Sequence, residues 1–307
     1  MIALSCLNLK EAINCLLPCF IVAGDFALKV QPDVRRSQKP GEATAFSQAL
    51  TDADMAIQNY FEVVLLAKFP SWGFFGEEES RNSVYFANYA AEQLGGGATK
   101  GSRSAEYVFT LDPINHTLPF QDGSACFDIV LSVSRAGRIV AGLTYLPALG
   151  EFYLGLEGAG LFTTSREEVQ SGTSWRPYSL PEASPRVMVY NDPAQKARLR
   201  EEFDVIDLVA DYKPQGWSTS INDILRGTLS AYARAQASII DWGAIACIVQ
   251  AGGGCVSDFS GAPIPSYWDF DDCKVPSLLV SINETVHERV LSCLSGGLRS
   301  RKKSSLS

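Results

Sequence analysis

Asp112-Pro113-Ile114-Asn115-His116-Thr117 directly follows an apolar run, Tyr107–Leu111, that has the length and composition of a buried strand. A carboxylate at the end of a strand faces a crevice where loops and helix ends gather. Two more acidic positions are of this kind, because Glu77 and Glu78 close another short apolar run and Asp241 opens an apolar helix. We therefore expect these acidic side chains to converge on one site.

Carboxylates that share a crevice repel one another unless a cation neutralises them. Oxygen ligands without histidine or thiolate favour a hard ion such as Mg²⁺. The chain has only two histidines, His116 and His287, which excludes a histidine-rich zinc centre and limits a Ser-His-Asp triad to one of the two. The eight cysteines form no C-x-x-C pair, so we expect buried, reduced thiols of a cytosolic protein.

The composition indicates a globular chain with a large core, since 46% of its 307 residues are hydrophobic and 20% are charged. The net charge of −8, from 34 acidic and 26 basic residues, argues against a nucleic-acid surface. The apolar N-terminus is interrupted by Lys10 and Glu11, so we expect no membrane span of the roughly 20 apolar residues needed. No basic segment precedes it, which also argues against a signal peptide. We expect a cytoplasmic protein without nucleic-acid or membrane partners.

The periodicity of the first half, residues 1–165, predicts an α+β arrangement. Two polar or glycine-rich stretches, Gln31–Glu42 and Gly95–Ser102, are expected to be loops. The predicted helices and strands of this half are Leu7–Val30 and Thr51–Phe69 (helices), and Trp72–Phe75, Tyr107–Leu111, Ile129–Ser134, Ile139–Leu146 and Glu151–Leu156 (strands).

A Ser/Thr/Pro-rich stretch, Thr163–Pro185, is expected to be the hinge to a second half, residues 180–298, in which strands and helices alternate as in α/β folds. The basic residues 299–307 are expected to be a disordered tail. The predicted elements of the second half are Val187–Tyr190, Val205–Ala210, Ser230–Arg234, Cys255–Asp258 and Ser277–Ser281 (strands), and Ala194–Phe203, Ser220–Gly227, Asp241–Ala251 and Glu284–Leu294 (helices).

Taken together and in this order, the acidic motifs resemble those of the inositol monophosphatase family. The family pattern runs G-E-E, D-P-I/L-D-G-T, and W-D-x-A followed by I-V-x-E-A-G-G. The matching stretches of this chain are Gly76-Glu77-Glu78, Asp112-Pro113-Ile114-Asn115-His116-Thr117, Asp241-Trp242-Gly243-Ala244 and Ile248-Val249-Gln250-Ala251-Gly252-Gly253-Gly254. The resemblance extends from about Gly24 to Val280. It implies a layered αβαβα sandwich and a Mg²⁺-dependent phosphomonoesterase that acts on a small phosphate ester.

The resemblance also implies roles for individual residues. Glu77, Asp112, Asn115, Asp241 and the carbonyl of Ile114 would hold metal ions. Asp54 and Thr117 would position the attacking water, and Glu78 has a catalytic role beside them. Backbone N–H groups after Ile114 would bind the phosphate, so that the substrate-binding set is Ile114, Asn115, His116, Thr117 and Arg234. Family members are often dimers, which makes a homodimer a possible assembly.

Three positions depart from the family pattern. Asn115 replaces an aspartate, so a second metal should bind more weakly, and we expect slow turnover that Asn115→Asp would speed up. His116 replaces a glycine, and its side chain could donate to the phosphate, block it or do neither. Arg234 stands where some members have a glutamate, which favours an anionic substrate unless the guanidinium is only solvated or ion-paired. The alternative function is a pseudophosphatase that binds a phosphorylated ligand or a protein partner.

Overall fold

The strands of the first half form a seven-stranded sheet in the order β3-β4-β5-β6-β7-β8-β9. The structure is a computed structural model, which describes residues 6–39, 41, 43–78, 105–172, 175–264, 266–267 and 274–303. The predicted meander is confirmed as antiparallel strands, and the predicted loop Gly95–Ser102 lies outside the described residues. The strands are β3 (Gly73–Gly76), β4 (Tyr107–Asn115), β5 (Asp128–Arg135), β6 (Arg138–Leu146), β7 (Glu151–Leu156), β8 (Gly160–Ser165) and β9 (Arg176–Pro177).

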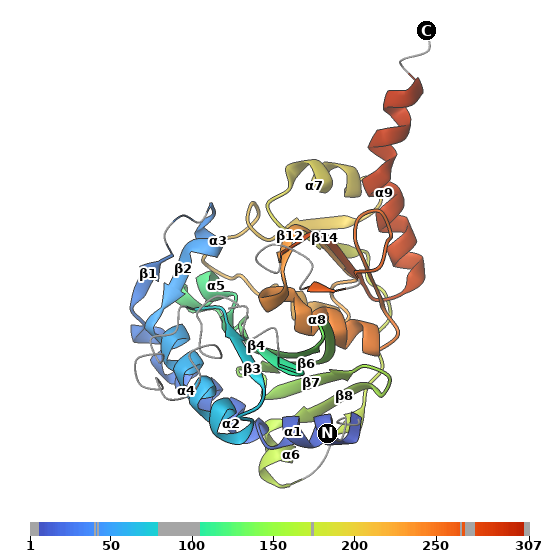
Figure 1. Ribbon diagram of the computed structural model, residues 1–307. Helices are drawn as coiled ribbons and strands as arrows, with labels where there is room; N and C mark the ends of the chain where they lie inside the picture. Colours follow the sequence, from blue (N-terminus) through green and yellow to red (C-terminus); the bar gives the residue numbers. More distant parts are fainter. Residues whose placement is uncertain are drawn as a thin grey trace.

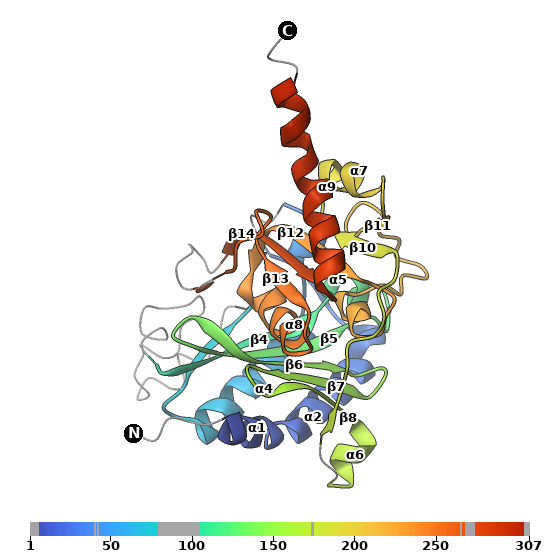
Figure 2. The same ribbon diagram turned by 90° about the vertical axis from the view of Figure 1, so that its right-hand side faces the viewer.

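Three helices, α1 (Cys6–Asn14), α2 (Leu17–Val30) and α4 (Asp52–Lys68), cover one face of this sheet (Figures 1 and 2). The predicted helix over Leu7–Val30 is broken between α1 and α2. Pro18 therefore falls in the first turn of α2, where its missing N–H breaks no hydrogen bond. The start of α4 is as predicted, because the hydroxyl of Thr51 accepts hydrogen bonds from the first-turn N–H groups.

The polar stretch Gln31–Glu42 is more ordered than its sequence suggests. It contains a 3-10 turn, η1 (Gln31–Asp33), and a strand, β1 (Arg36–Gln38), which pairs with β2 (Ala49–Thr51) after the short helix α3 (Ala45–Gln48). All three residues of β1 are exposed. Because neither face of this strand is buried, its sequence has no alternating pattern from which it could be predicted.

The second half forms a five-stranded sheet in the order β11-β10-β12-β14-β13. Its strand β11 ends earlier than the predicted strand Val205–Ala210. It stops at Asp207, whose carboxylate accepts hydrogen bonds from the N–H groups of Val209 and Ala210 and so turns the chain. The predicted helix Ser220–Gly227 is only a 3-10 turn, η4 (Ile221–Ile224). The strands are β10 (Arg186–Val189), β11 (Asp204–Asp207), β12 (Ala231–Ser238), β13 (Cys255–Ser257) and β14 (Lys274–Ser281).

The apolar helix α8 (Ile239–Ala251) lies between the two sheets (Figure 1). It packs closely against the larger sheet because β6 and β7 present glycines to it. A Cβ atom at Gly142 would lie 2.3 Å from the carbonyl oxygen of Ala244, and one at Gly155 would lie 2.5 Å from the Cα of Ile248. These two glycines set the depth of α8 and therefore the position of Asp241 in its first turn.

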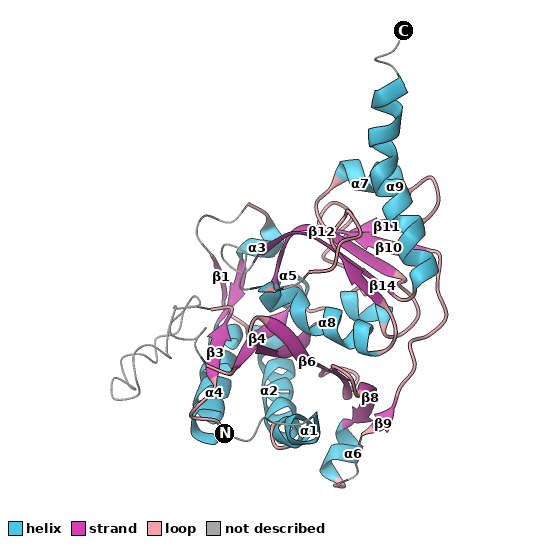
Figure 3. Ribbon diagram, turned by 45° about the vertical axis from the view of Figure 1, so that its right-hand side comes forward, coloured by secondary structure: helices cyan, strands magenta, loops and turns pink. Residues whose placement is uncertain are grey.

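Two helices, α7 (Pro193–Leu199) and α9 (Glu284–Lys303), cover the outer side of the smaller sheet (Figure 3). The layers thus alternate αβαβα, which confirms the predicted sandwich. The stretch expected as a hinge carries the short helix α6 (Arg166–Gln170) and β9, which still belongs to the first sheet. Helix α9 ends at Lys303 and so includes part of the segment 299–307 that we expected to be a tail.

The sequence-based expectation that no segment is long and apolar enough to cross a membrane is wrong. The stretch Leu9–Asp33, which contains most of α1 and all of α2, reaches that length, and its most apolar 18-residue window has a mean hydropathy of 1.7. The stretch contains charged residues, but they are too few to lower the mean hydropathy of this window. Of that window, 44% is buried inside the fold, where Phe20 packs edge-on against Phe61 at 4.7 Å between ring centroids.

The expectation of buried cysteines is met only in part. Among the cysteines that the structure describes, Cys247 is buried and Cys15 is exposed. The remaining four are half-buried, namely Cys19, Cys126, Cys255 and Cys293.

Candidate active site

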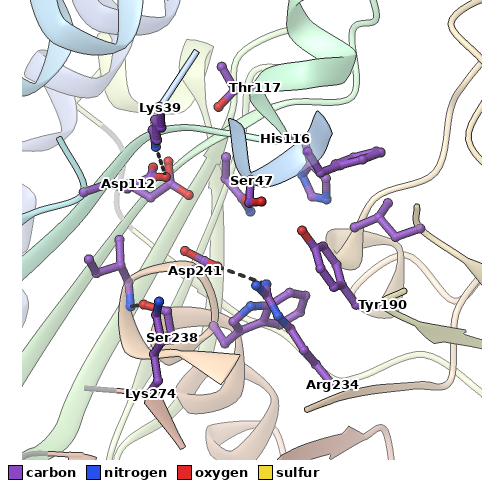
Figure 4. Close-up of a pocket in the computed structure, with 16 residues that line it drawn as sticks. Lys39, Ser47, Asp112, His116, Thr117, Tyr190, Arg234, Ser238, Asp241 and Lys274 are labelled. Carbon is purple, nitrogen blue, oxygen red and sulfur yellow. Dashed lines mark hydrogen bonds and ion pairs between the residues drawn. The ribbon is translucent and has the colours of Figure 1, made fainter. Parts of the chain in front are cut away.

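A cavity of about 240 Å³ lies where the end of β4 meets the first turn of α8 and the middle of β12 (Figure 4). Its wall contains acidic, basic and aromatic side chains from segments that are far apart in the sequence. The lining residues are Lys39, Phe46, Ser47, Glu77, Asp112, Asn115, His116, Thr117, Tyr190, Leu208, Arg234, Ser238, Ile240, Asp241, Trp242 and Lys274.

The cavity brings together most of the residues that the sequence singles out. Glu77, Asp112, Asn115, His116, Thr117, Arg234 and Asp241 all line it. The other three do not line it but bind residues that do. Glu78 contacts Lys39, while Asp54 and the carbonyl of Ile114 both accept hydrogen bonds from Thr117.

Lys39, from the segment after β1, is the cation nearest to the acidic pair at the end of β3. Its Nζ lies 2.5 Å from Glu77 Oε1 and 2.8 Å from Glu78 Oε1. Burial by itself would lower the pKa of Lys39, but the charges of the two carboxylates and their hydrogen bonds outweigh it, and the pKa of Lys39 is raised. Burial and the neighbouring Glu77 raise the pKa of Glu78 to about 8. The ammonium group of Lys39 therefore stabilises the carboxylates of Glu77 and Glu78.

Asp112 is the least compensated of the acidic residues. It is 3% exposed, and its Oδ1 is buried without a hydrogen-bond partner among the residues that the structure describes. Burial, followed by the charges of Glu77 and Asp241, raises the pKa of Asp112 well above its ordinary value. An isolated carboxylate oxygen surrounded by other carboxylates leaves room for a positive charge that the side chains themselves do not supply.

Asp54, Thr117 and Ile114 form a buried chain of hydrogen bonds beside the cavity. The hydroxyl oxygen of Thr117 lies 2.9 Å from the carbonyl oxygen of Ile114 and 3.3 Å from Asp54 Oδ1. The backbone N–H and the hydroxyl of Thr51 both donate to Asp54 Oδ2. Burial raises the pKa of Asp54 to about 7, so this carboxylate gains and loses a proton near neutral pH.

Arg234 is ion-paired, which is one of the possibilities that the sequence left open, and it also lines the cavity. Its guanidinium lies 3.0 Å from Asp241 Oδ2 and stacks 4.0 Å above the ring of Tyr190 (Figure 4). The ring of Trp242 lies on another side, 5.4 Å from the guanidinium carbon, and is itself stacked on Tyr232. Arg234 Nε is buried without a partner. This wall is therefore aromatic and positively charged.

The loop after β4 has an unusual backbone. The register of β4 and β5 shifts between Asp112 and Asn115, where Pro113 cannot donate a ladder hydrogen bond. His116 then adopts a left-handed conformation, with φ of 69°, before the short helix α5 (Thr117–Gln121). Only glycine adopts this conformation without steric cost, so His116 is held there by its surroundings.

The donor set is suited to a hard cation such as Mg²⁺, because all the acidic ligands are oxygen atoms and Asp112 keeps one oxygen unpartnered. Within the described ranges, however, no three His, Cys, Asp or Glu side chains form a group that could hold a metal ion as they stand. Lys39 binds Glu77, and Arg234 binds Asp241. A metal ion would have to displace Lys39 from Glu77, so the predicted ligation stays a prediction.

Several residues of the site could not be identified from the sequence. Lys39 and Phe46 lie in the stretch around β1 and α3, whose polar sequence reads as a loop. Tyr190 and Lys274 lie at strand ends of the second half, where single residues have no motif around them. A missed acid, Asp128, is the first residue of β5 and is buried beside the cavity loop.

A model of the inositol monophosphatase family matches residues 19–295. A histidinol-phosphatase of Chlorobaculum parvum is 24% identical over 82% of this chain and 85% of its own length. An IMPase structure from Thermotoga maritima superposes with a TM-score of 0.68 at 17% identity, over 94% of this chain and 99% of that one. A structure titled IMPase/NADP phosphatase complexed with NADP and Ca²⁺ has a TM-score of 0.66 at 16% identity and covers 95% of this chain and 97% of that one. The two structural likenesses show the fold.

Proposed function

Because the chain belongs to the inositol monophosphatase family, we propose that it is a Mg²⁺-dependent phosphomonoesterase that acts on a small phosphate ester. The observation that carries this proposal is the cavity in which Glu77, Asp112 and Asp241 meet Asn115 and Thr117. The names of two similar proteins, a histidinol-phosphatase and an IMPase/NADP phosphatase, support this proposal, because both describe enzymes that remove phosphate. We further propose a cytoplasmic location and, from the family alone, a homodimer.

When bound, Mg²⁺ would activate water near neutral pH and stabilise the leaving oxygen. Glu77, Asp112, Asp241, the amide oxygen of Asn115 and the carbonyl of Ile114 would hold it. The unpartnered oxygen of Asp112 supports this assignment. Asn115 brings an oxygen without a charge, so the set has one negative charge fewer than the family pattern, which supports weaker binding of a second ion.

Asp54 and Thr117 would orient the attacking water and accept its proton. The hydroxyl of Thr117 already donates to Asp54 Oδ1 at 3.3 Å, so a water bound to Thr117 is one hydrogen bond from a buried carboxylate. The raised pKa of Asp54, about 7, suits a group that takes up a proton near neutral pH. Glu78 would contribute indirectly, through its contact with Lys39.

The substrate is proposed to carry a second anionic group besides the phosphate that is removed. Arg234 and Lys274 bring positive charge to the cavity wall, and Tyr190 and Trp242 add aromatic surface beside Arg234. A neutral polyol would leave the inward-facing guanidinium of Arg234 without a new partner. A carboxylate or second phosphate on the substrate would bind it directly.

Phosphate release from a panel of sugar, inositol and nucleotide phosphates in the presence of Mg²⁺ tests the proposed function. We expect turnover, with the highest kcat/KM for esters that bear a second anionic group. The variant Arg234→Gln should lower kcat/KM for those esters by roughly tenfold or more, and change it little for neutral esters. If no ester in the panel releases phosphate, the enzyme proposal is wrong. If Arg234→Gln affects all esters equally, Arg234 does not select the substrate.

The alternative, a pseudophosphatase, is favoured by one set of observations. Lys39 and Arg234 already pair with carboxylates that a metal would need, and Asn115 removes a further charge. In that case the cavity would bind a phosphorylated ligand without turnover. Binding of the same esters in calorimetry, without phosphate release, would support this alternative.

Lys39 is predicted to compete with Mg²⁺ for Glu77. In Lys39→Met the carboxylates lose their internal cation, so the free energy of unfolding without divalent ions should fall by about 2 kcal/mol. Added Mg²⁺ should then raise the melting temperature more than it does for the parent, since binding to the folded state alone stabilises it. Lys274→Met, at another wall of the cavity, is the matched control. An equal rise for Lys39→Met and the parent would exclude the competition.

A further inference from the structure

Asp128, which neither the motifs nor the family comparison points to, is the buried carboxylate on which the cavity loop depends. It is the first residue of β5, is 1% exposed, and pairs in register with Asn115 on β4. Its Oδ1 accepts a hydrogen bond from Asn115 Nδ2 at 3.1 Å, and its Oδ2 accepts one from the hydroxyl of Thr144 at 2.6 Å. The Nδ1 atom of His116 lies 3.6 Å from the same Oδ1.

These contacts fix which end of the Asn115 amide faces the cavity. A carboxylate only accepts hydrogen bonds, so the NH₂ group of Asn115 must face Asp128 and the amide oxygen must face the other way. Asn115 lines the cavity, so that oxygen is available to a ligand there. Without Asp128, the amide could turn either a donor or an acceptor towards the ligand.

The carboxylate of Asp128 also lies close to the imidazole of His116. This residue is 7% exposed and holds a left-handed backbone conformation that is costly for any side chain. The approach of its Nδ1 to Asp128 offers a compensating interaction and keeps the imidazole on the wall of the cavity, on the side of Tyr190 (Figure 4). Asn115 and His116, two of the three departures from the family pattern, thus share one buried partner.

We propose that Asp128 is a positioning residue for the reaction: it turns the amide oxygen of Asn115 towards the cavity, where this oxygen would hold the metal ion, and it keeps the imidazole of His116 on the cavity wall. This inference rests on the proposed function. It also revises the expected effect of Asn115→Asp. That change alone would put two carboxylates within about 3 Å of each other inside the protein, and one would have to be protonated or move away. The negative charge of this loop lies on Asp128, one side chain away from the cavity.

Exchanging the side chains of Asn115 and Asp128 tests the hydrogen bond between them. In the double variant Asn115→Asp with Asp128→Asn, donor and acceptor change places and the hydrogen bond is kept. We expect Asn115→Asp alone to unfold at lower denaturant concentration than the parent, and the double variant to recover most of the loss. The coupling should correspond to roughly a tenfold change in the unfolding equilibrium constant. This cycle needs no activity, so it tests the pair even if the proposed function is wrong.

Turnover tests the positioning. Asp128→Ala should lower kcat by roughly tenfold to a hundredfold, as is typical for partners that orient a ligand, with a smaller change in KM. In an Asn115→Ala, His116→Ala background the same change should have little further effect, because Asp128 acts through these residues. Ser134→Ala, a buried polar change on the same strand, is the control and should leave kcat unchanged.

The conservative variant Asp128→Asn keeps the experiment informative if Asp128→Ala does not fold. It should retain more of the parent kcat than any variant with an apolar side chain at this position. The proposal is overturned if a folded variant with an apolar side chain at position 128 has kcat within twofold of the parent, or if the double variant is no more stable than Asn115→Asp. If the parent releases no phosphate from any ester, the proposed function fails. The unfolding measurements then still test whether Asn115 and Asp128 interact as described.

Discussion

Asp112→Asn is expected to reduce kcat/KM by roughly a thousandfold or more, and to remove the Mg²⁺ binding that calorimetry detects for the parent. The reason is the position of Asp112, whose carboxylate faces Glu77 and Asp241 and keeps one buried oxygen without a hydrogen-bond partner. The amide has the same shape but no charge, so it cannot replace a carboxylate ligand. If Asp112→Asn binds Mg²⁺ as tightly as the parent, this residue does not hold the ion.

Although Asp112→Asn should lower activity, we expect it to stabilise the folded protein near neutral pH. Because burial and neighbouring carboxylates raise the pKa of Asp112 in the folded protein, the folded state binds its proton more tightly than the unfolded state. Its contribution to stability is therefore present at low pH and is lost as pH rises from the ordinary carboxyl pKa through the raised one. Without divalent ions, Asp112→Asn should weaken this loss. Denaturant unfolding between pH 4 and 8 measures it, and a steeper pH dependence in the variant would contradict the expectation.

Gly142→Ala is expected to be the most destabilising change outside the cavity, by about 3 kcal/mol. The added Cβ would meet the carbonyl oxygen of Ala244 at 2.3 Å and its Cα at 2.9 Å, and backbone atoms cannot move aside as a side chain can. Helix α8 would have to move away from β6 and would take Asp241 with it. Activity should therefore fall even at temperatures where the variant is folded.

Two other glycines serve as controls for Gly142→Ala. Gly155→Ala meets the backbone of α8 at Ile248 and should also destabilise the protein strongly. Gly123→Ala meets no atom within 4 Å, and its positive φ of 81° predicts a smaller loss, of about 1 kcal/mol. Denaturant unfolding compares the three. If Gly142→Ala unfolds at the same denaturant concentration as the parent, the close contact with α8 does not limit stability.

The meander and the start of α4 could be predicted because each depends on neighbours in the sequence. Residues 128–156 form apolar, largely buried strands that short turns at 136–137 and 147–150 separate. The side chain of Thr51 caps the helix that follows it directly. The segment around β1 could not be predicted, because its order comes from pairing with β2 and its own residues are exposed. The apolar stretch Leu9–Asp33 could not be judged by composition alone, because core helices and membrane spans share it.

Which acidic residues belong together follows from the sequence alone, since Glu77 and Asp112 each end an apolar run, Asp241 opens an apolar helix, and all three stand in motifs with a fixed order. Their chemistry, oxygen ligands without histidine or thiolate, is also a property of the sequence. Which cations pair with these carboxylates depends on the tertiary structure. Lys39 and Asp128 have no local pattern that marks them. Lys39 reaches the cavity from the segment after β1, which pairs with β2, and Asp128 lies behind the cavity loop through the pairing of β4 with β5. Electrostatic interactions depend on distance in space and on burial, and neither can be read from spacing along the chain.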